Sequence, residues 1–459
     1  MITWHTYDES TYKTTRYNIL YWVEETGNPS TTPYIDTKNN PTMGIGFNLL
    51  VRRNLDAILM EMGFNVSATG TEGQYITDLR NAVEARNLQQ LNTTMNQWAS
   101  DATVSTHNGK DKRSTFFLDY NEINNVFNTI APYYEVGVDA WIATYGLTVE
   151  RYSRERAVFF SLAYNSRDAN NDGIPDLLGD NLGKAIKNGN RAEAWFEIRY
   201  GSNLGDVPGI AKRRYYESDL FGLYNSGSVD EGEAKTIMRM YTLHKNKIDA
   251  YDEKLGMWVA KANEHYHVTW VKTLEDNLND AKSFLITNFA EGQPIDNVFV
   301  GKGLSTYEYK EQGDYNDGNL VGTDKNDLIF GEKGNDTLDG GGNGNTDVMI
   351  GGDGNDTYKV DDPNDKIVEK DGEGKELVES TATYTLPANV EDLTLMGTEN
   401  INGTGNELDN VIKGNTGINI LNGGGGNKET LLIALAKTIY NGKRRNVMPV
   451  DFETLRGAA

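Results

Sequence analysis

Glycine-aspartate repeats in the C-terminal half constrain the fold of this chain more than any other feature. Two nine-residue segments, GEKGNDTLD from Gly331 and GGDGNDTYK from Gly351, fit the pattern G-G-x-G-x-D-x-U-x, in which U is a large apolar residue. Their aspartates belong to a series spaced nine, eleven and nine residues apart, and an apolar residue follows each aspartate two positions later. The series is Asp327, Asp336, Asp347 and Asp356, with Ile329, Leu338, Met349 and Tyr358 at the U positions.

This periodicity predicts a parallel β-roll, because a glycine-rich linker would not keep both the spacing and the apolar position. Glycines allow the loops to bend where backbone carbonyls and aspartates surround a calcium ion, while the U side chains stack inside. We therefore expect residues 313–427 to bind Ca²⁺ through the four aspartates. Without the ion these carboxylates repel one another, so we expect the segment to remain unfolded.

The repeats resemble those of RTX proteins, and the following string through Val390 and Asn402 to Leu421 is similar to the weaker strand repeats of that family. The resemblance implies export by a type I secretion apparatus and folding on calcium outside the cell. The pattern stops after Asn427, and residues 428–459 begin like an amphipathic helix with a basic centre. This tail is consistent with a secretion signal, a capping helix or a change of reading frame.

A second informative stretch, residues 21–50, carries Glu24, Glu25, Asp36 and Thr42. Apolar spacing predicts a helix that ends just after the two glutamates, and the alternation that follows predicts a hairpin on which the aspartate and the threonine face one cleft. Glycoside hydrolysis needs a carboxylic acid to protonate the leaving oxygen and a second group to position water or stabilise the cation. A glutamate half covered by apolar neighbours is where a carboxyl pKa rises.

The succession E-x-G, Y-x-D and T-x-G-x-G in this stretch resembles the phage-type lysozymes of glycoside hydrolase family 24. The resemblance implies that Glu25 is the general acid, that Asp36 and Thr42 hold or activate the hydrolytic water, and that the reaction inverts the anomeric centre. That family usually has glycine directly after the glutamate, whereas Thr26 intervenes here. Glu24 therefore remains an alternative for the acid.

Residues 190–224 resemble the closing helices of the same family, so the resemblance reaches both ends of a domain of about 225 residues. Two readings of Arg213 and Arg214 stay open. Either one arginine supports the glutamate cleft through a charge-assisted bond, or both lie on a solvated helix face.

The loop DANNDGIPD places oxygen-bearing side chains on alternate residues, as calcium loops require. Its candidate ligands are Asp168, Asn170, Asp172 and Asp176. Gly179 stands where an EF-hand has glutamate, so the loop is more similar to those of thrombospondin type 3 or dockerin modules. The alternative is an Asx-rich turn.

Composition excludes several classes of function. A net charge of -23 and a pI near 4.7 argue against a nucleic acid partner, and the absence of cysteine excludes disulfides and cysteine nucleophiles. No apolar run is long enough to span a bilayer, and no Sec-type signal peptide is visible at the N-terminus.

We therefore expect a multidomain protein: a mainly α, α+β lysozyme-like domain (1–226), a helical spacer (227–312), a parallel RTX β-roll (313–427) and a helical tail (428–459). The expected function is that of a secreted, calcium-stabilised muramidase that cleaves the β-1,4 bond between N-acetylmuramic acid and N-acetylglucosamine in peptidoglycan. Two alternatives are a catalytically inactive wall-binding or structural protein and a bacteriocin-like toxin.

Overall fold

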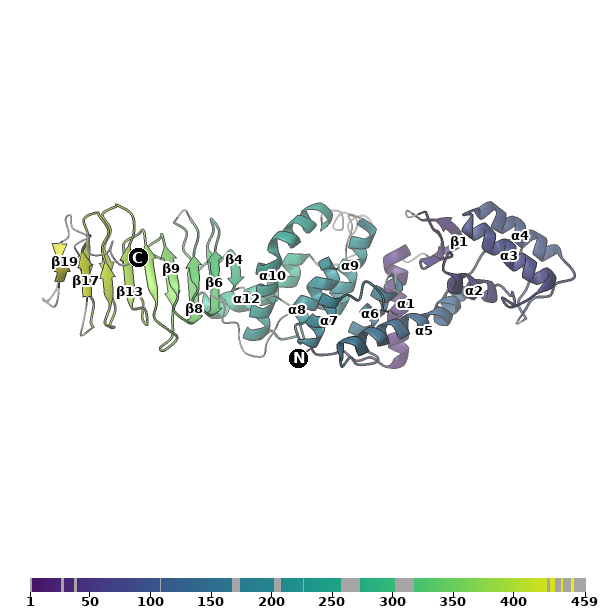
Figure 1. Ribbon diagram of the computed structural model, residues 1–459, viewed down its shortest axis with the longest axis horizontal. Helices are drawn as coiled ribbons and strands as arrows, with labels where there is room; N and C mark the ends of the chain where they lie inside the picture. The colour runs from purple at the N-terminus through teal and green to yellow at the C-terminus, as the bar shows by residue number, and fades with distance from the viewer. Residues whose placement is uncertain are drawn as a thin grey trace. The chain divides into compact units, whose positions relative to one another are not determined.

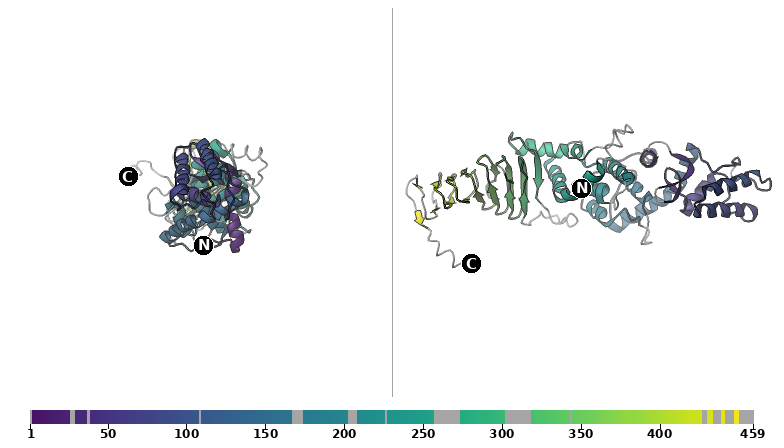
Figure 2. Two further views of the ribbon diagram at one scale, coloured as in Figure 1. Left: turned by 90° about the vertical axis from the view of Figure 1, so that its right-hand side faces the viewer. Right: turned by 90° about the horizontal axis from the view of Figure 1, so that it is seen from above.

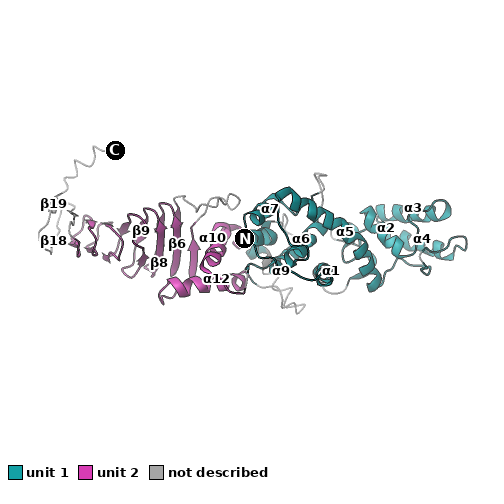
Figure 3. Ribbon diagram, turned by 90° about the horizontal axis from the view of Figure 1, so that it is seen from below, with its two compact units in different colours: residues 1–225, 251–273 teal, residues 226–250, 274–459 magenta. Residues whose placement is uncertain are grey.

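The computed structural model describes residues 2–25, 29–36, 39–107, 109–166, 174–201, 208–225, 227–256, 273–301, 318–342, 344–426, 430–433, 439–440 and 447–449. Of these, residues 21–25, 208–210, 255–256 and those from 430 onward are described by their backbone alone. The chain forms two compact units, one of residues 1–225 and 251–273 and the other of residues 226–250 and 274–459 (Figure 3).

The first unit consists of two lobes at the ends of one long helix, α5 (Tyr120–Tyr145) (Figure 1). One lobe contains an antiparallel sheet and three helices: β1 (Ser30–Ile35), β2 (Pro41–Gly44), β3 (Phe47–Asn48), α2 (Arg52–Glu61), α3 (Gly70–Glu84) and α4 (Leu88–Ser100). The other lobe is helical: α1 (Glu9–Glu25), α6 (Arg154–Tyr164), α7 (Asp180–Lys187), α8 (Arg191–Phe196) with a π-helical turn (Glu197–Gly201), and α9 (Pro208–Phe221).

Local sequence sets the ends of α5, and aromatic packing holds the two lobes onto it. A capping box between Asp119 and Glu122 starts the helix, and Gly146 ends it in the left-handed conformation with φ of 61°. Trp141 is fully buried at the helical lobe, where its ring meets that of Phe159 at a centroid distance of 5.1 Å. Helix α5 thus contributes to both lobes.

The second unit begins with α10 (Glu231–Tyr251) and α12 (Leu274–Phe289) and continues as a parallel β-solenoid. A short π-helical turn (Asp252–Gly256) that follows α10 belongs to the first unit. Its strands stack side by side in parallel sheets (Figure 2). They are β4 (Asn297–Val300), β5 (Asn319–Val321), β6 (Asp327–Lys333), β7 (Thr337–Asp339), β8 (Val348–Asp353), β9 (Thr357–Val360), β10 (Lys366–Val368), β11 (Leu377–Ser380), β12 (Tyr384–Thr385), β13 (Asp392–Leu395), β14 (Gly403–Thr404), β15 (Val411–Lys413), β16 (Ile420–Asn422), β17 (Thr430–Ile433), β18 (Ile439–Tyr440) and β19 (Val447–Pro449).

The core of the solenoid is a column of apolar side chains from successive strands. Ile329, Leu338, Met349 and Tyr358, the residues at the U positions, are all fully buried in this column. Farther along, residues such as Val378 continue it. The expected parallel β-roll is therefore confirmed as the architecture of the C-terminal region.

Two segments differ from the expected secondary structure. Strand β4 lies within the span expected to be a helical spacer, where Val298 pairs with Leu328 of β6. Strands β17, β18 and β19 lie where a helical tail was expected, and Leu431 of β17 pairs with Ile412 of β15. In both cases the backbone groups of a neighbouring coil provide the hydrogen-bonding partners of the strand.

Helix α10 covers the open edge of the solenoid at its first coil. The Thr242 hydroxyl accepts a hydrogen bond from the Val300 N–H at 3.2 Å, and Arg239 donates to the Gly301 carbonyl at 3.0 Å. Arg239 and Lys235 also form ion pairs with Glu332. None of the described helices combines the length and apolar character that crossing a membrane requires.

Candidate metal centre and candidate active site

The four aspartates of the repeats form two buried ladders that run from coil to coil, one of Asp327 and Asp347 and the other of Asp336 and Asp356. Asp327 opens β6, and Asp336, Asp347 and Asp356 each stand one residue before a strand. All four are at most 3% exposed. The Asp347 carboxylate accepts a hydrogen bond from the Asp327 N–H at 2.8 Å, and the Asp356 carboxylate accepts one from the Asp336 N–H at 2.7 Å. The sequence spacing thus places equivalent carboxylates above one another, one coil apart.

One member of the ladder was missing from the sequence prediction. Asp365 is 5% exposed, and its carboxylate accepts a hydrogen bond from the Asp347 N–H at 2.9 Å. It lies nine residues after Asp356, and Ile367 follows it at the U position, so both spacing signals are present. The glycines of the repeat are absent before it, so the glycine-aspartate pattern does not extend to Asp365.

The loops beside this ladder have the oxygen chemistry that calcium requires. A Cβ added at Gly322 would lie 2.6 Å from Asp327 Oδ2, and one at Gly331 would lie 2.7 Å from both Asp336 Oδ2 and the Gly351 carbonyl oxygen. Only glycine therefore allows carboxylates and the carbonyls of the next coil to approach this closely. Carboxylate and carbonyl oxygens are the ligands that Ca²⁺ prefers, so the residues present fit the ion.

The side chains alone do not complete such a site. Within the described ranges, no group of three or more histidines, aspartates or glutamates is arranged to hold a metal ion. Each ion would therefore take about one carboxylate per repeat and draw its remaining ligands from backbone carbonyls, as the repeat pattern predicts.

Burial, together with the neighbouring carboxylates of Asp365, Asp327 and Asp361, raises the pKa of Asp347 to about 8, although the hydrogen bond from the Asp327 N–H lowers it. Burial likewise raises the pKa of Asp365 to about 6. The ladder therefore disfavours ionised carboxylates, because water cannot screen their charge there. A bound divalent cation would favour the ionised form by offsetting the repulsion.

In the first unit, the structure brings two of the three predicted catalytic residues into contact. Tyr34 of β1 pairs with Thr42 of β2, and Asp36 follows β1 directly. Asp36 Oδ2 accepts a hydrogen bond from the Thr42 hydroxyl at 3.3 Å, while Asp36 Oδ1 accepts one from the Asn40 N–H at 2.8 Å. Asn39 adopts a φ of 61° in the turn. The hairpin thus fixes the carboxylate beside a buried hydroxyl.

The remaining predicted residues are only partly described. Glu24 and Glu25 end α1, but their side chains lie outside the described residues. Of the predicted calcium loop, Asp168, Asn170 and Asp172 also lie outside them, and Asp176 stands in the turn before α7.

The two arginines of α9 are not on a solvated face, which corrects one of the two readings above. Arg214 is 2% exposed and forms an ion pair with Glu217, which also accepts a hydrogen bond from the Ser161 hydroxyl at 2.5 Å. Arg213 is also buried, and burial lowers its pKa to about 9. Both arginines are therefore part of the interior of the helical lobe.

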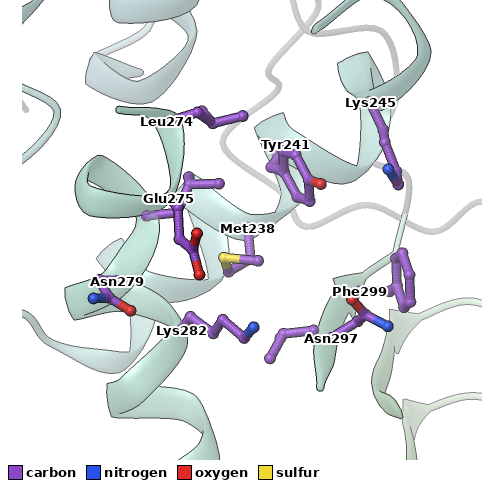
Figure 4. Close-up of a pocket in the computed structure, with 11 residues that line it drawn as sticks. Met238, Tyr241, Lys245, Leu274, Glu275, Asn279, Lys282, Asn297 and Phe299 are labelled. Carbon is purple, nitrogen blue, oxygen red and sulfur yellow. The ribbon is translucent and has the colours of Figure 1, made fainter. Parts of the chain in front are cut away.

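A cavity of about 250 Å³ lies in the second unit between α10, α12 and β4 (Figure 4). Its basic side chains are engaged by the protein itself: Lys282 donates to the Asp296 carbonyl at 2.5 Å, and Lys245 forms an ion pair with Asp249. None of the residues singled out from the sequence lines this cavity.

Comparison with known families supports the C-terminal assignment. The model of the RTX calcium-binding nonapeptide repeat matches residues 312–346, 342–358 and 404–427, in four copies. No curated protein and no solved structure shows a significant match to the chain. The C-terminal region is thus a parallel β-solenoid with RTX calcium-binding repeats, and the family comparison provides no match for the N-terminal unit.

Proposed function

We propose that this protein is a calcium-stabilised peptidoglycan hydrolase, a muramidase whose catalytic residues are Glu25, Asp36 and Thr42. The observation that carries the proposal is the hydrogen bond between the Thr42 hydroxyl and Asp36 Oδ2 at 3.3 Å on a hairpin that directly follows a helix ending at Glu25. A carboxylate and a hydroxyl held together suit the positioning of a water molecule. A glutamate one element away suits protonation of the leaving sugar oxygen.

The surroundings of the hairpin support this chemistry. Thr42 is 4% exposed and its hydroxyl also contacts the Asn40 carbonyl at 3.3 Å, so its orientation is restricted. Helix α1, which carries the proposed acid, packs against α6 and α9 of the helical lobe, whereas the hairpin belongs to the other lobe. An acid and a water-positioning pair on separate lobes suit a polymeric substrate that lies between them.

The RTX region suits a role outside the cell. Its buried aspartates remain unfavourable until calcium is abundant, so the solenoid would fold after export rather than before it. We propose type I secretion and an extracellular site of action, with bacterial wall peptidoglycan as the substrate and bacteriolysis as the outcome.

The test is loss of turbidity and release of reducing sugar from purified cell walls, with the full chain in calcium. Glu25→Gln, Asp36→Asn and Thr42→Val are expected to abolish or strongly reduce both signals, and Glu9→Gln, at the exposed start of the same helix, serves as the matched control. Undiminished lysis by Glu25→Gln together with loss of lysis in Glu24→Gln would move the acid to Glu24. Binding to walls without sugar release by the unaltered protein would instead indicate a wall-binding protein.

A further inference from the structure

The later coils of the solenoid carry asparagine where the earlier coils carry aspartate. Asn410 and Asn419 each lie five residues after a glycine, the same spacing that separates Gly331 from Asp336. Both asparagines are fully buried. A Cβ added at Gly414 would lie 2.6 Å from Asn419 Oδ1, as close as the corresponding approach in the aspartate coils. The two residue types therefore occupy equivalent places in the fold.

The direction of hydrogen bonding reverses between the two groups of coils. In the aspartate coils the side chain accepts, as Asp347 does from the Asp327 N–H. In the asparagine coils the side chain donates: Asn410 Nδ2 lies 3.1 Å from the carbonyl oxygens of both Val390 and Glu391. An N–H donor occupies a lone pair of the carbonyl oxygen that would otherwise be available to a cation.

The other asparagines extend the same arrangement. Asn419 Nδ2 donates to the Ile401 carbonyl at 2.7 Å, and Asn415 Nδ2 donates to the carbonyls of Met396 at 2.9 Å and Glu399 at 3.0 Å. Asn406 Nδ2 donates to the Val390 carbonyl at 2.8 Å. The amide ladder thus occupies the backbone carbonyls that would otherwise be available to coordinate an ion.

The amide oxygens leave too few ligands for calcium. Asn410 Oδ1 accepts the Asn406 N–H at 2.8 Å, and Asn415 Oδ1 accepts the Asn419 amide at 2.8 Å. Among the described residues, Asn419 Oδ1 alone of these three has no hydrogen-bond donor. These three side chains thus offer one uncommitted neutral oxygen, whereas Ca²⁺ takes six to eight oxygen ligands, several of them charged.

We infer that the coils over residues 403–426 bind no calcium and are held by this asparagine ladder, although residues 404–427 match the calcium-binding repeat model. The aspartate coils, from Asp327 to Asp365, keep the buried charged ligands that calcium requires. The solenoid therefore consists of a cation-dependent part and a cation-independent extension that stacks on it.

The first test is a crystal structure of the full chain grown in calcium, with anomalous data collected at a long wavelength where calcium scatters. Peaks are expected beside the aspartate coils and none beside Asn406, Asn410, Asn415 or Asn419. An anomalous peak coordinated by any of these asparagines would overturn the inference.

The second test counts the calcium ions bound by the full chain in equilibrium dialysis. Asn410→Ala with Asn419→Ala is expected to leave the number unchanged, and hydrogen exchange should show loss of protection over residues 403–426. The matched pair Asp336→Asn with Asp356→Asn, at the same repeat positions of earlier coils, is expected to lower the number. A lower count in the asparagine variant, with protection of residues 327–368 intact, would contradict the inference.

Discussion

The backbone N–H of Asp327 donates to the carboxylate of Asp347 across 2.8 Å, from one coil of the solenoid to the next. This single contact joins two calcium-type aspartates that lie 20 residues apart in the sequence. The bond holds Asp347 Oδ1 and leaves Oδ2 beside Gly340, so the side chain is oriented before an ion binds. Such preorientation reduces the conformational entropy lost when a ligand binds.

Replacing Asp347 with asparagine should weaken calcium binding to the aspartate coils. The change removes a charge from the ladder but keeps the shape of the side chain, and we expect at least a ~10-fold rise in the Kd of the tightest affected site, the low end of what neighbours of metal ligands cost. Isothermal titration of the full chain measures this. Asp353 ends β8, the strand that starts after Asp347, and its side chain is 59% exposed. Asp353→Asn is therefore the control and should have little effect.

In the absence of calcium, the solenoid should be favoured by acid. The pKa of Asp347 in the folded chain is about 8, well above that of an aspartate in an unfolded chain, about 3.9. Between these values the folded state holds more protons, so the free energy of unfolding falls as pH rises through this window. Far-UV circular dichroism in chelator should therefore show more β-structure at pH 5 than at pH 8. The double variant Asp347→Asn with Asp365→Asn should lose part of this pH dependence. An unchanged pH profile in that variant would show that these two carboxyls do not cause it.

Thr42 should matter more for catalysis than for stability. Thr42→Val removes a buried hydroxyl that contacts Asp36 and the Asn40 carbonyl, which should cost about 1 kcal/mol of unfolding free energy. If the hydroxyl positions water, wall hydrolysis should fall by roughly 100-fold, and Thr42→Ser should retain most activity. Thr32→Val, on the exposed side of β1, is the control. Equal activity of the valine and serine variants would exclude the proposed role.

A buried ion cluster around Glu135 should anchor α1 in the helical lobe. The Glu135 carboxylate pairs with Arg16 of α1 at 2.5 Å and with Arg156 of α6 at 2.8 Å, and it accepts a hydrogen bond from the Tyr12 hydroxyl at 2.8 Å. Glu135→Ala leaves two buried arginines without this partner and should lower the free energy of unfolding by about 3 kcal/mol. Thermal unfolding tests this.

Asp139→Asn is the control for that experiment. Asp139 contacts the same Arg156, but its side chain is 64% exposed, so its removal should cost well under half as much. A similar loss of unfolding free energy in both variants would show that burial of the cluster does not determine its contribution to stability. Because α1 ends at Glu25, Glu135→Ala should also lower wall hydrolysis.

The sequence predicted those features that repeat at fixed spacing. The U residues and the aspartates recur with a period, so the β-roll and its stacked aspartates followed from the pattern. Asp365 was missed because residues 359–364 lack the usual glycines of the repeat. The contact between Asp36 and Thr42 could be predicted from the sequence because only a short turn separates the two residues. The pairing of Val298 with Leu328 could not be predicted, since Asn297–Val300 becomes a strand only by pairing with a strand about 30 residues later in the sequence.

The contacts of Thr242 and Arg239 with the first coil have a consequence for self-association. An exposed sheet edge invites another chain to add its own strands, and repeated addition of this kind builds fibres. Here the Val300 N–H and the Gly301 carbonyl are already bonded to α10. These two bonds occupy backbone groups through which a second copy could add a strand to β4, and they therefore disfavour head-to-tail stacking at that edge.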